Sequence, residues 1–343
     1  MYKRRRTRIK LISILFAGGA VALLVVLAIF LLDTKKMSPG EFFLSRKGNS
    51  FSKVQFKTYD HNKKEISLQA DDVCENEKNN YTLKNMLSTF ALPNGKILIV
   101  TANSTKVHRK DKTLCELIGN VKLSMESGLR LETDKMFIDF TKKIANGDTE
   151  IIISQDDTKL FAEKYIYDSE SNILTLKGKA RGLFGINKIS SDELIIHLDN
   201  TCGENIKSIL ATGDVVYSGE IYTLKAKKIR YSNDKIEAWS DVVLFFKKNG
   251  SDCETRADFM QASIKRGKID SIKANGSLII KTKNVTIRAQ EGIFNGEKIK
   301  VIGNVIISEK QGNIFGNNAT LNLKTDDISI DKASGIIVNG IHK

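Results

Sequence analysis

Residues 299–307 read IKVIGNVII, and this stretch decides the fold. Apolar residues recur at every second position from Ile299 to Ile307. Such alternation is typical of a β-strand with one face in a core and the other in solvent. Gly303 and Asn304 interrupt the alternation, as expected where a strand bends, bulges or turns. The stretch therefore predicts a half-buried strand with an irregular middle.

The same interruption recurs along the chain, each time inside an apolar alternation. Its copies are Gly119-Asn120-Val121, Gly147-Asp148-Thr149, Gly178-Lys179-Ala180, Gly213-Asp214-Val215, Ser240-Asp241-Val242, Gly276-Ser277-Leu278 and Gly303-Asn304-Val305. Between them runs a second motif, in which an apolar residue is followed two positions later by a small residue and then by polar residues. The small residues are Ala70, Ala102, Thr133, Ala162, Ser191, Ala226, Ala257 and Ala289.

The small residues are 29 to 35 positions apart, which is the mark of a repeat architecture. We expect each repeat to hold about three short strands, stacked as antiparallel hairpins. Pro39 and Pro93 are the only prolines, so the later chain keeps every backbone donor for ladder bonds. The repeat predicts an all-β fold of long paired ladders.

The length of 343 residues is enough for two ordinary domains. With 41% hydrophobic and 27% charged residues, the composition is that of a folded globular chain. Overall disorder is therefore excluded as a description.

Residues 11–32 form an uncharged apolar run that is long enough to cross a bilayer as a helix. A cleaved signal peptide is the alternative, but the run is longer than a signal's apolar region and lacks a small-x-small site. Basic residues of the segment 1–10 outnumber Lys35 and Lys36 after the run, which favours a cytoplasmic amino terminus. We expect a single-pass membrane protein whose bulk is exported.

The chain carries a formal charge of +14, of which about +8 remains once the six basic residues before the apolar run are set aside. This balance suits an anionic ligand or surface, or it serves solubility alone. Nucleic acid is disfavoured as a partner, because no reader motif occurs and export separates the two. Cys74, Cys115, Cys202 and Cys253 lack CxxC spacing and are either paired in one of three ways or free.

Residues able to perform catalysis are scarce. The four histidines show no metal-ligand spacing, and neither a GxSxG nor a phosphate-loop pattern occurs. Acidic residues fall in turns and on polar strand faces, where a solvated role is the default. The sequence predicts neither an enzyme nor a metal or cofactor site.

The order of these elements resembles the LptC family of lipopolysaccharide export proteins over residues 1–183. The resemblance rests on the basic terminus, the single span, and the repeats from Gly119-Asn120-Val121 to Leu174-Thr175-Leu176-Lys177-Gly178. Later motifs are similar to the repeats of LptA and OstA-type domains: Gly213-Asp214-Val215, the stretch from Leu224 to Tyr231, and Gly303-Asn304-Val305. This implies a basic tail (1–10), a transmembrane helix (11–32), an LptC-like jellyroll (37–183) and an LptA/OstA-like jellyroll (184–343).

The resemblance implies an elongated, open β-jellyroll whose apolar groove carries the acyl chains of lipopolysaccharide through the periplasm. By alternation, the expected lining residues are Leu131, Ile138, Phe140, Leu224, Ile229, Tyr231, Ile287, Ile299, Val301, Val305 and Ile307. The alternative for each is that it only packs against the others in a closed core.

The implied partners are lipopolysaccharide, an inner-membrane ABC transporter resembling LptB2FG, and an LptA-like or LptD-like jellyroll. The last of these is expected at a carboxy-terminal strand edge that has no proline and no charge before Lys343. Its residues are Ile336, Ile337, Val338 and Ile341. A structural or adhesin-like β-solenoid is the alternative function, and a charged or Asn-lined interior would favour it.

Overall fold

The computed structural model describes residues 42–47, 50–59, 65–75, 80–91, 97–108, 114–126, 128–139, 141–198, 206–248, 251–265, 268–295, 298–310, 312–323, 325, 327–331, 333 and 335–338. The predicted transmembrane helix (11–32) lies outside these residues. Among the residues described, no helix is both long and apolar enough to span a bilayer.

The chain divides into two compact units. The N-terminal unit contains the described residues up to 184 together with 195–198 and 206–207. The C-terminal unit contains residues 185–194 and the described residues from 208 onward. The strand β13 (Asn187–Leu198) contributes to both.

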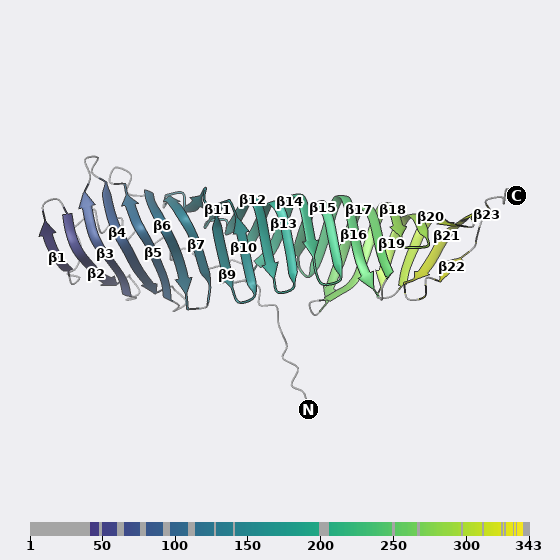
Figure 1. Ribbon diagram of the computed structural model, residues 1–343, viewed down its shortest axis with the longest axis horizontal. Helices are drawn as coiled ribbons and strands as arrows, with labels where there is room; N and C mark the ends of the chain where they lie inside the picture. Colours follow the sequence, from purple (N-terminus) through teal and green to yellow (C-terminus); the bar gives the residue numbers. More distant parts are fainter. Residues whose placement is uncertain are drawn as a thin grey trace, which may run out of the picture. The chain divides into compact units, whose positions relative to one another are not determined.

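The N-terminal unit is built from strands that follow one another in chain order (Figure 1). They are β1 (Phe42–Lys47), β2 (Ser50–Tyr59), β3 (Glu65–Glu75), β4 (Tyr81–Ala91), β5 (Ile97–Val107), β6 (Leu114–Met125), β7 (Arg130–Asp139), β8 (Ile144–Gly147), β9 (Ile151–Gln155), β10 (Thr158–Ala162), β11 (Lys164–Asp168) and β12 (Ile173–Phe184). From β1 to β7 each strand pairs antiparallel with the next. The strands β8 and β9 then share the edge of β7, and β11 and β10 pair with them in turn.

The C-terminal unit continues in the same manner. Its strands are β14 (Ile206–Ser218), β15 (Tyr222–Ser232), β16 (Lys235–Lys248), β17 (Ser251–Lys265), β18 (Lys268–Lys281), β19 (Thr286–Asn295), β20 (Lys298–Glu309), β21 (Gly312–Asn322), β22 (Ile328–Asp331) and β23 (Gly335–Val338). Successive strands from β14 to β21 pair antiparallel, and β22 and β23 both pair with β21. The predicted all-β class with stacked antiparallel strands is confirmed.

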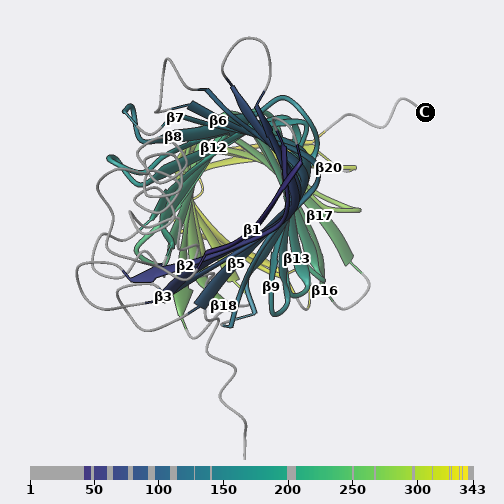
Figure 2. The ribbon, with the colours of Figure 1, turned by 90° about the vertical axis from the view of Figure 1, so that its left-hand side faces the viewer.

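The predicted interruptions are bulges in the middle of long strands. Gly276 and Ser277 have φ of 76° and 43°, and the register between β18 and its neighbours shifts there. In β20, Gly303 and Asn304 have φ of 82° and 47°, and the register between β20 and its neighbours shifts at these two residues. Two successive left-handed residues turn the strand sharply, and glycine adopts that conformation without steric cost. In each unit the bent strands curve around an interior (Figure 2).

The prediction of three short strands per repeat is wrong, because one repeat corresponds to two long bent strands. The strands β17 and β18, for example, have 15 and 14 residues. A bulge leaves the ladder bonds intact on both sides, so the strand bends without ending. The ladder is divided where β8 and β9, or β10 and β11, take the place of one long strand, and again where β22 and β23 both pair with β21.

The two sequence motifs meet at these bends. All eight small residues are buried. In register, Ala226 stands opposite Val215 and Ala289 opposite Leu278, the apolar residues that directly follow a bulge. The polar residue after the small one lies over the bulge glycine: a Cβ on Gly276 would be 2.4 Å from Asp258 Oδ2. The repeat therefore encodes a bend from both neighbouring strands.

Candidate lipid-binding groove

The bulges divide the sheet of the C-terminal unit into two halves that face each other. Half-sheet A comprises residues 228–232, 235–239, 259–265, 268–275 and 291–295. Half-sheet B comprises residues 215–218, 222–225, 242–248, 251–257, 278–281 and 286–289. Each bent strand from β15 to β19 contributes one segment to each half.

An apolar cleft lies between the half-sheets. Its empty space is about 340 Å³ when the open solvent at its mouth is counted, of which about 20 Å³ is room for the centre of a water-sized molecule. Half-sheet B contributes Tyr217, Tyr222, Leu224 and Leu244, and half-sheet A contributes Ile236, Met260, Ala262, Ile269 and Ile272. Tyr222, Ile236 and Ile269 lie near hairpin ends, while Leu224, Leu244 and Met260 lie nearer the bulges, so the cleft extends from the seam between the two halves toward the bends. The side chain of Ile269 is 36% exposed at this seam.

A hydrogen-bonded tyrosine pair forms one end of the cleft. The Tyr222 hydroxyl donates to Asn187 Oδ1 at 3.0 Å, and the hydroxyl oxygens of Tyr217 and Tyr222 are 3.3 Å apart. Burial raises the pKa of Tyr217, and its hydrogen bond with Tyr222 adds to the shift. Burial also raises the pKa of Tyr222. Both hydroxyls therefore stay protonated and provide the polar atoms of an otherwise apolar lining.

A phenylalanine pair lies next to the cleft, where Phe246 stands opposite the cleft residue Tyr222 in the ladder between β15 and β16. Phe246 of half-sheet B and Phe294 of half-sheet A meet edge-on, with ring centroids 6.1 Å apart and planes at 79°. Phe246 follows the cleft residue Leu244 by two positions, which puts both on one strand face. Phe294 stands opposite the cleft residue Ile272 in the ladder. The contact therefore joins the half-sheets directly beside the cleft.

Ten of the eleven predicted lining residues are described, and Leu224 is the one that lines this cleft. Tyr231 is half-buried. The other eight are buried in the interiors of their units: Leu131, Ile138, Ile229, Ile287, Ile299, Val301, Val305 and Ile307. Phe140 lies outside the described residues. Contact of these side chains with lipid stays a prediction.

Sequence reasoning missed eight of the nine cleft residues, although most of them belong to the same alternation as Leu224. Three of them share a signal of position, because Tyr222, Ile236 and Ile269 each lie within a few residues of a hairpin. Alternation alone does not separate residues near the seam from residues near the bends, since both point inward.

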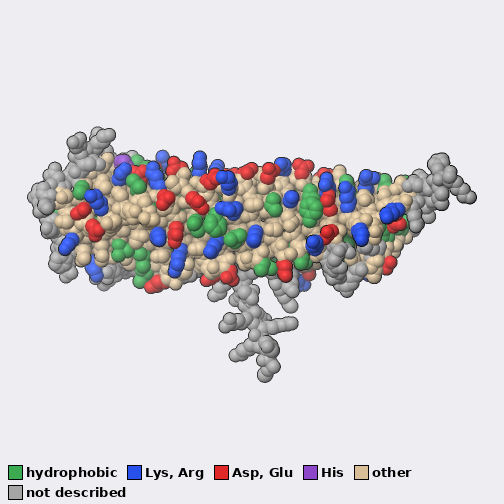
Figure 3. Space-filling model, in the orientation of Figure 1, with side chains coloured by type: hydrophobic (Ala, Val, Ile, Leu, Met, Phe, Trp, Pro, Cys, Tyr) green, Lys and Arg blue, Asp and Glu red, His purple; other side chains and the backbone are tan. Residues whose placement is uncertain are grey.

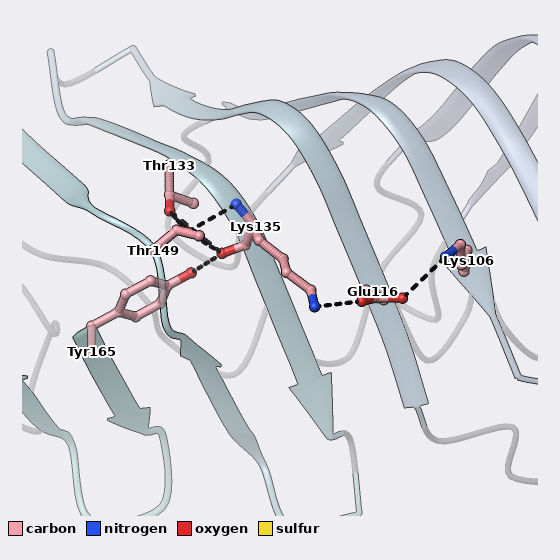
Figure 4. Close-up of polar contacts among 6 residues, drawn as sticks. All are labelled: Lys106, Glu116, Thr133, Lys135, Thr149 and Tyr165. Atoms are coloured by element: carbon pink, nitrogen blue, oxygen red, sulfur yellow. Dashed lines mark hydrogen bonds and ion pairs between the residues drawn. The ribbon is translucent and has the colours of Figure 1, made fainter. Parts of the chain in front are cut away.

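The interior of the N-terminal unit carries one polar corner, where β8 gives way to β9 (Figure 4). Thr149 sits in this gap, and its hydroxyl accepts from the Lys135 backbone N–H at 3.1 Å. The Tyr165 hydroxyl donates to the Lys135 carbonyl at 3.1 Å. The two side chains replace ladder bonds that the divided strand does not make. A Cβ on Gly147 would lie 2.4 Å from the Tyr165 ring, which explains glycine there.

The outer faces are charged, with cations and anions interspersed (Figure 3). In the N-terminal unit Glu116 lies between Lys135 and Lys106, at 2.9 and 3.7 Å. In the C-terminal unit Lys228 and Arg230 approach the face of Trp239, at 5.6 and 5.3 Å from the ring centroid. The buried polar residues among those described are serines and threonines, and none is charged. Charge is thus kept to the outside of both units.

The described residues hold no cluster of three or more His, Cys, Asp or Glu side chains suited to a metal ion. Cys74 and Cys115 are free thiols, Cys253 Sγ lies 3.9 Å from the Thr255 hydroxyl, and Cys202 lies outside the described residues. Burial, together with the neighbouring Glu116 carboxylate, raises the pKa of Cys115 to about 12.

Residues 49–184 match the family model described as lipopolysaccharide-assembly, LptC-related. Over that part of its length the chain is similar to LptC-related proteins. No curated protein sequence matches the chain. Among solved structures, the chain is similar to LptH of Pseudomonas aeruginosa, the LptA-homologous periplasmic component of its lipopolysaccharide transport device. The identity is 11%, the similarity covers 35% of this chain and 82% of that one, and the TM-score is 0.29. A similarity of this size does not extend to function.

Proposed function

We propose that the protein is a non-enzymatic component of a lipopolysaccharide export bridge, anchored in the inner membrane and extending into the periplasm. The observation that carries the proposal is the LptC-related match over residues 49–184. The apolar cleft between half-sheets A and B supports it, because its lining residues are of the kind that suits an acyl chain in the second unit as well.

The physical task is to keep acyl chains away from water during transfer. Exposed apolar surface costs roughly 25 cal/mol per Å², so a lipid with several acyl chains cannot cross an aqueous compartment uncovered. Bent strands whose inner faces are apolar and whose outer faces are charged meet this need, since the interior takes the chains while the outside stays hydrated. An adhesin-like solenoid would need no apolar cleft.

The anchor in this proposal is the apolar run 11–32, with the amino terminus in the cytoplasm. A reporter that is active only outside the cytoplasm, fused after Lys343, should be active. Exchanging the charge clusters on the two sides of the run should reduce correct insertion. An inactive reporter would reject both the orientation and the periplasmic location.

Two strand edges are the proposed contacts with protein partners. In the part of the chain that is described, β1 pairs with β2 and β23 pairs with β21, each on one side only. Unpaired backbone groups at such an edge can add a strand from another sheet. We assign the β1 edge to an ABC transporter resembling LptB2FG and the β23 edge to an LptA-like or LptD-like jellyroll. Deleting residues 335–343 should abolish capture of the distal partner in a pull-down while membrane association and folding persist.

The test of lipid carriage is site-specific photo-crosslinking in cells. A diazirine side chain at Leu131 or Leu224 should capture lipopolysaccharide. The matched control is Lys225, next in the chain to Leu224 and exposed on the outer face. Equal capture at Leu224 and Lys225 would indicate adhesion to the surface and would reject transport through the interior.

A further inference from the structure

The cleft and the packed interior beside it are separated by the phenylalanine pair. On the cleft side, Leu244 and Ile272 line open space. On the other side, Ile299 stands opposite Phe294 in the ladder and is fully buried, as are Val301 and Ile307. On half-sheet A, Phe294 lies between Ile272 and Ile299 in the ladder, so an acyl chain that moved along this face from the cleft toward β20 meets the contact between Phe246 and Phe294.

The ring contact between Phe246 and Phe294 is separate from the backbone hydrogen bonds that pair the strands. Phe246 lies on β16 in half-sheet B, and Phe294 lies on β19 in half-sheet A. No ladder bond joins these two segments directly, because β17 and β18 stand between them in the sheet. An edge-to-face ring pair is weak beside such ladders, so the rings can part while every strand stays paired. Phe246 is half-buried, which leaves one of the two rings room to rotate.

We propose that Phe246 and Phe294 form a gate that separates the acyl-binding cleft from the interior toward β20. The gate is closed in this structure, and an acyl chain advances only when the two rings separate. The inference rests on the proposed lipid carriage and adds to it a point of control and the residues that provide it.

The experiment compares lipopolysaccharide capture before and behind the gate in the full-length protein in cells. A diazirine analogue of an aliphatic residue replaces Leu244, which lines the cleft, or Ile299, which lies behind the gate. Each is tested in the wild-type background and with Phe246→Ala or Phe294→Ala. The matched control is Phe259→Ala, which removes a ring of the same size that contacts Trp239 at 5.7 Å.

With the gate widened by Phe246→Ala or Phe294→Ala, capture at Ile299 should rise several-fold relative to capture at Leu244. Phe259→Ala should leave this ratio unchanged. The variants Phe246→Leu and Phe294→Leu keep apolar volume at the seam and should give a smaller rise, which tests the gate even if an alanine variant misfolds. A ratio that is the same in all backgrounds overturns the gate while leaving lipid carriage supported. Capture at neither position in any background rejects the proposed function and the gate with it.

Discussion

Replacing Gly276 by alanine tests the claim that the repeat encodes a bend from two neighbouring strands. Gly276 has a φ of 76°, and a Cβ there would lie 2.4 Å from Asp258 Oδ2 and 3.0 Å from Asp258 Cβ. A left-handed conformation costs a non-glycine residue about 1–2 kcal/mol. Displacing the Asp258 side chain from its rotamer adds about 0.5–1.5 kcal/mol. We expect Gly276→Ala to destabilise the bend by about 1.5–3.5 kcal/mol in total.

The assay is hydrogen exchange of peptides from β17 and β18, since a long repeat array does not unfold as one unit. The expected loss corresponds to exchange roughly 10- to 300-fold faster, at tenfold per 1.4 kcal/mol. Adding Asp258→Ala to Gly276→Ala should recover the free energy lost by displacing the Asp258 side chain. It should not recover the cost of the left-handed backbone conformation at residue 276. Ser277→Ala, at an exposed position that already holds an L-residue at φ 43°, should change the rate by less than about threefold. Unchanged exchange in Gly276→Ala, or no recovery in the double variant, would refute the reasoning.

Two further predictions concern titratable groups in the N-terminal unit. Burial opposes ionisation of Glu116. The hydrogen bond and positive charge of Lys135, together with the charge of Lys106, outweigh burial and lower the pKa of Glu116 below 4.5. A lowered pKa gives stability that is complete above pH 4.5 and is lost as the pH falls through the folded-state pKa. Glu116→Gln should thus cost up to about 1 kcal/mol at pH 7 and less at pH 3, as measured by local hydrogen exchange; an equal cost at both pH values would contradict this. Because the pKa of Cys115 is raised to about 12, native protein at pH 8 should alkylate at half-buried Cys74 well before Cys115, and mass spectrometry showing equal rates would disprove the burial.

The sequence was sufficient to predict the class of fold and the positions of its irregularities. Period-two alternation with almost no proline leaves few options besides ladders of half-buried strands. The Gly276-Ser277 and Gly303-Asn304 pairs were identified as bends because few other residues tolerate left-handed backbone. The strand count per repeat was wrong because a bulge and a chain reversal use the same residue types.

The candidate site was predicted less well. Alternation identifies the inward face of a strand, and the described candidates such as Leu224, Val301 and Ile307 are indeed buried. It does not say how far apart the two facing half-sheets lie at a given position. That spacing depends on side chains from strands distant in sequence, such as Phe246 on β16 against Phe294 on β19. The location of the cleft therefore emerged only from the folded arrangement.

The central claim is that the protein carries lipopolysaccharide, and native mass spectrometry of the full-length protein purified in mild detergent tests it most directly. We predict bound lipopolysaccharide in the wild-type protein. Leu224→Asp should bind less, because a buried unpaired carboxylate is costly and disfavours an acyl chain beside it, whereas Lys225→Asp on the outer face should bind as the wild type does. Absence of lipopolysaccharide from the wild-type protein, or its equal loss from both variants, would contradict the account.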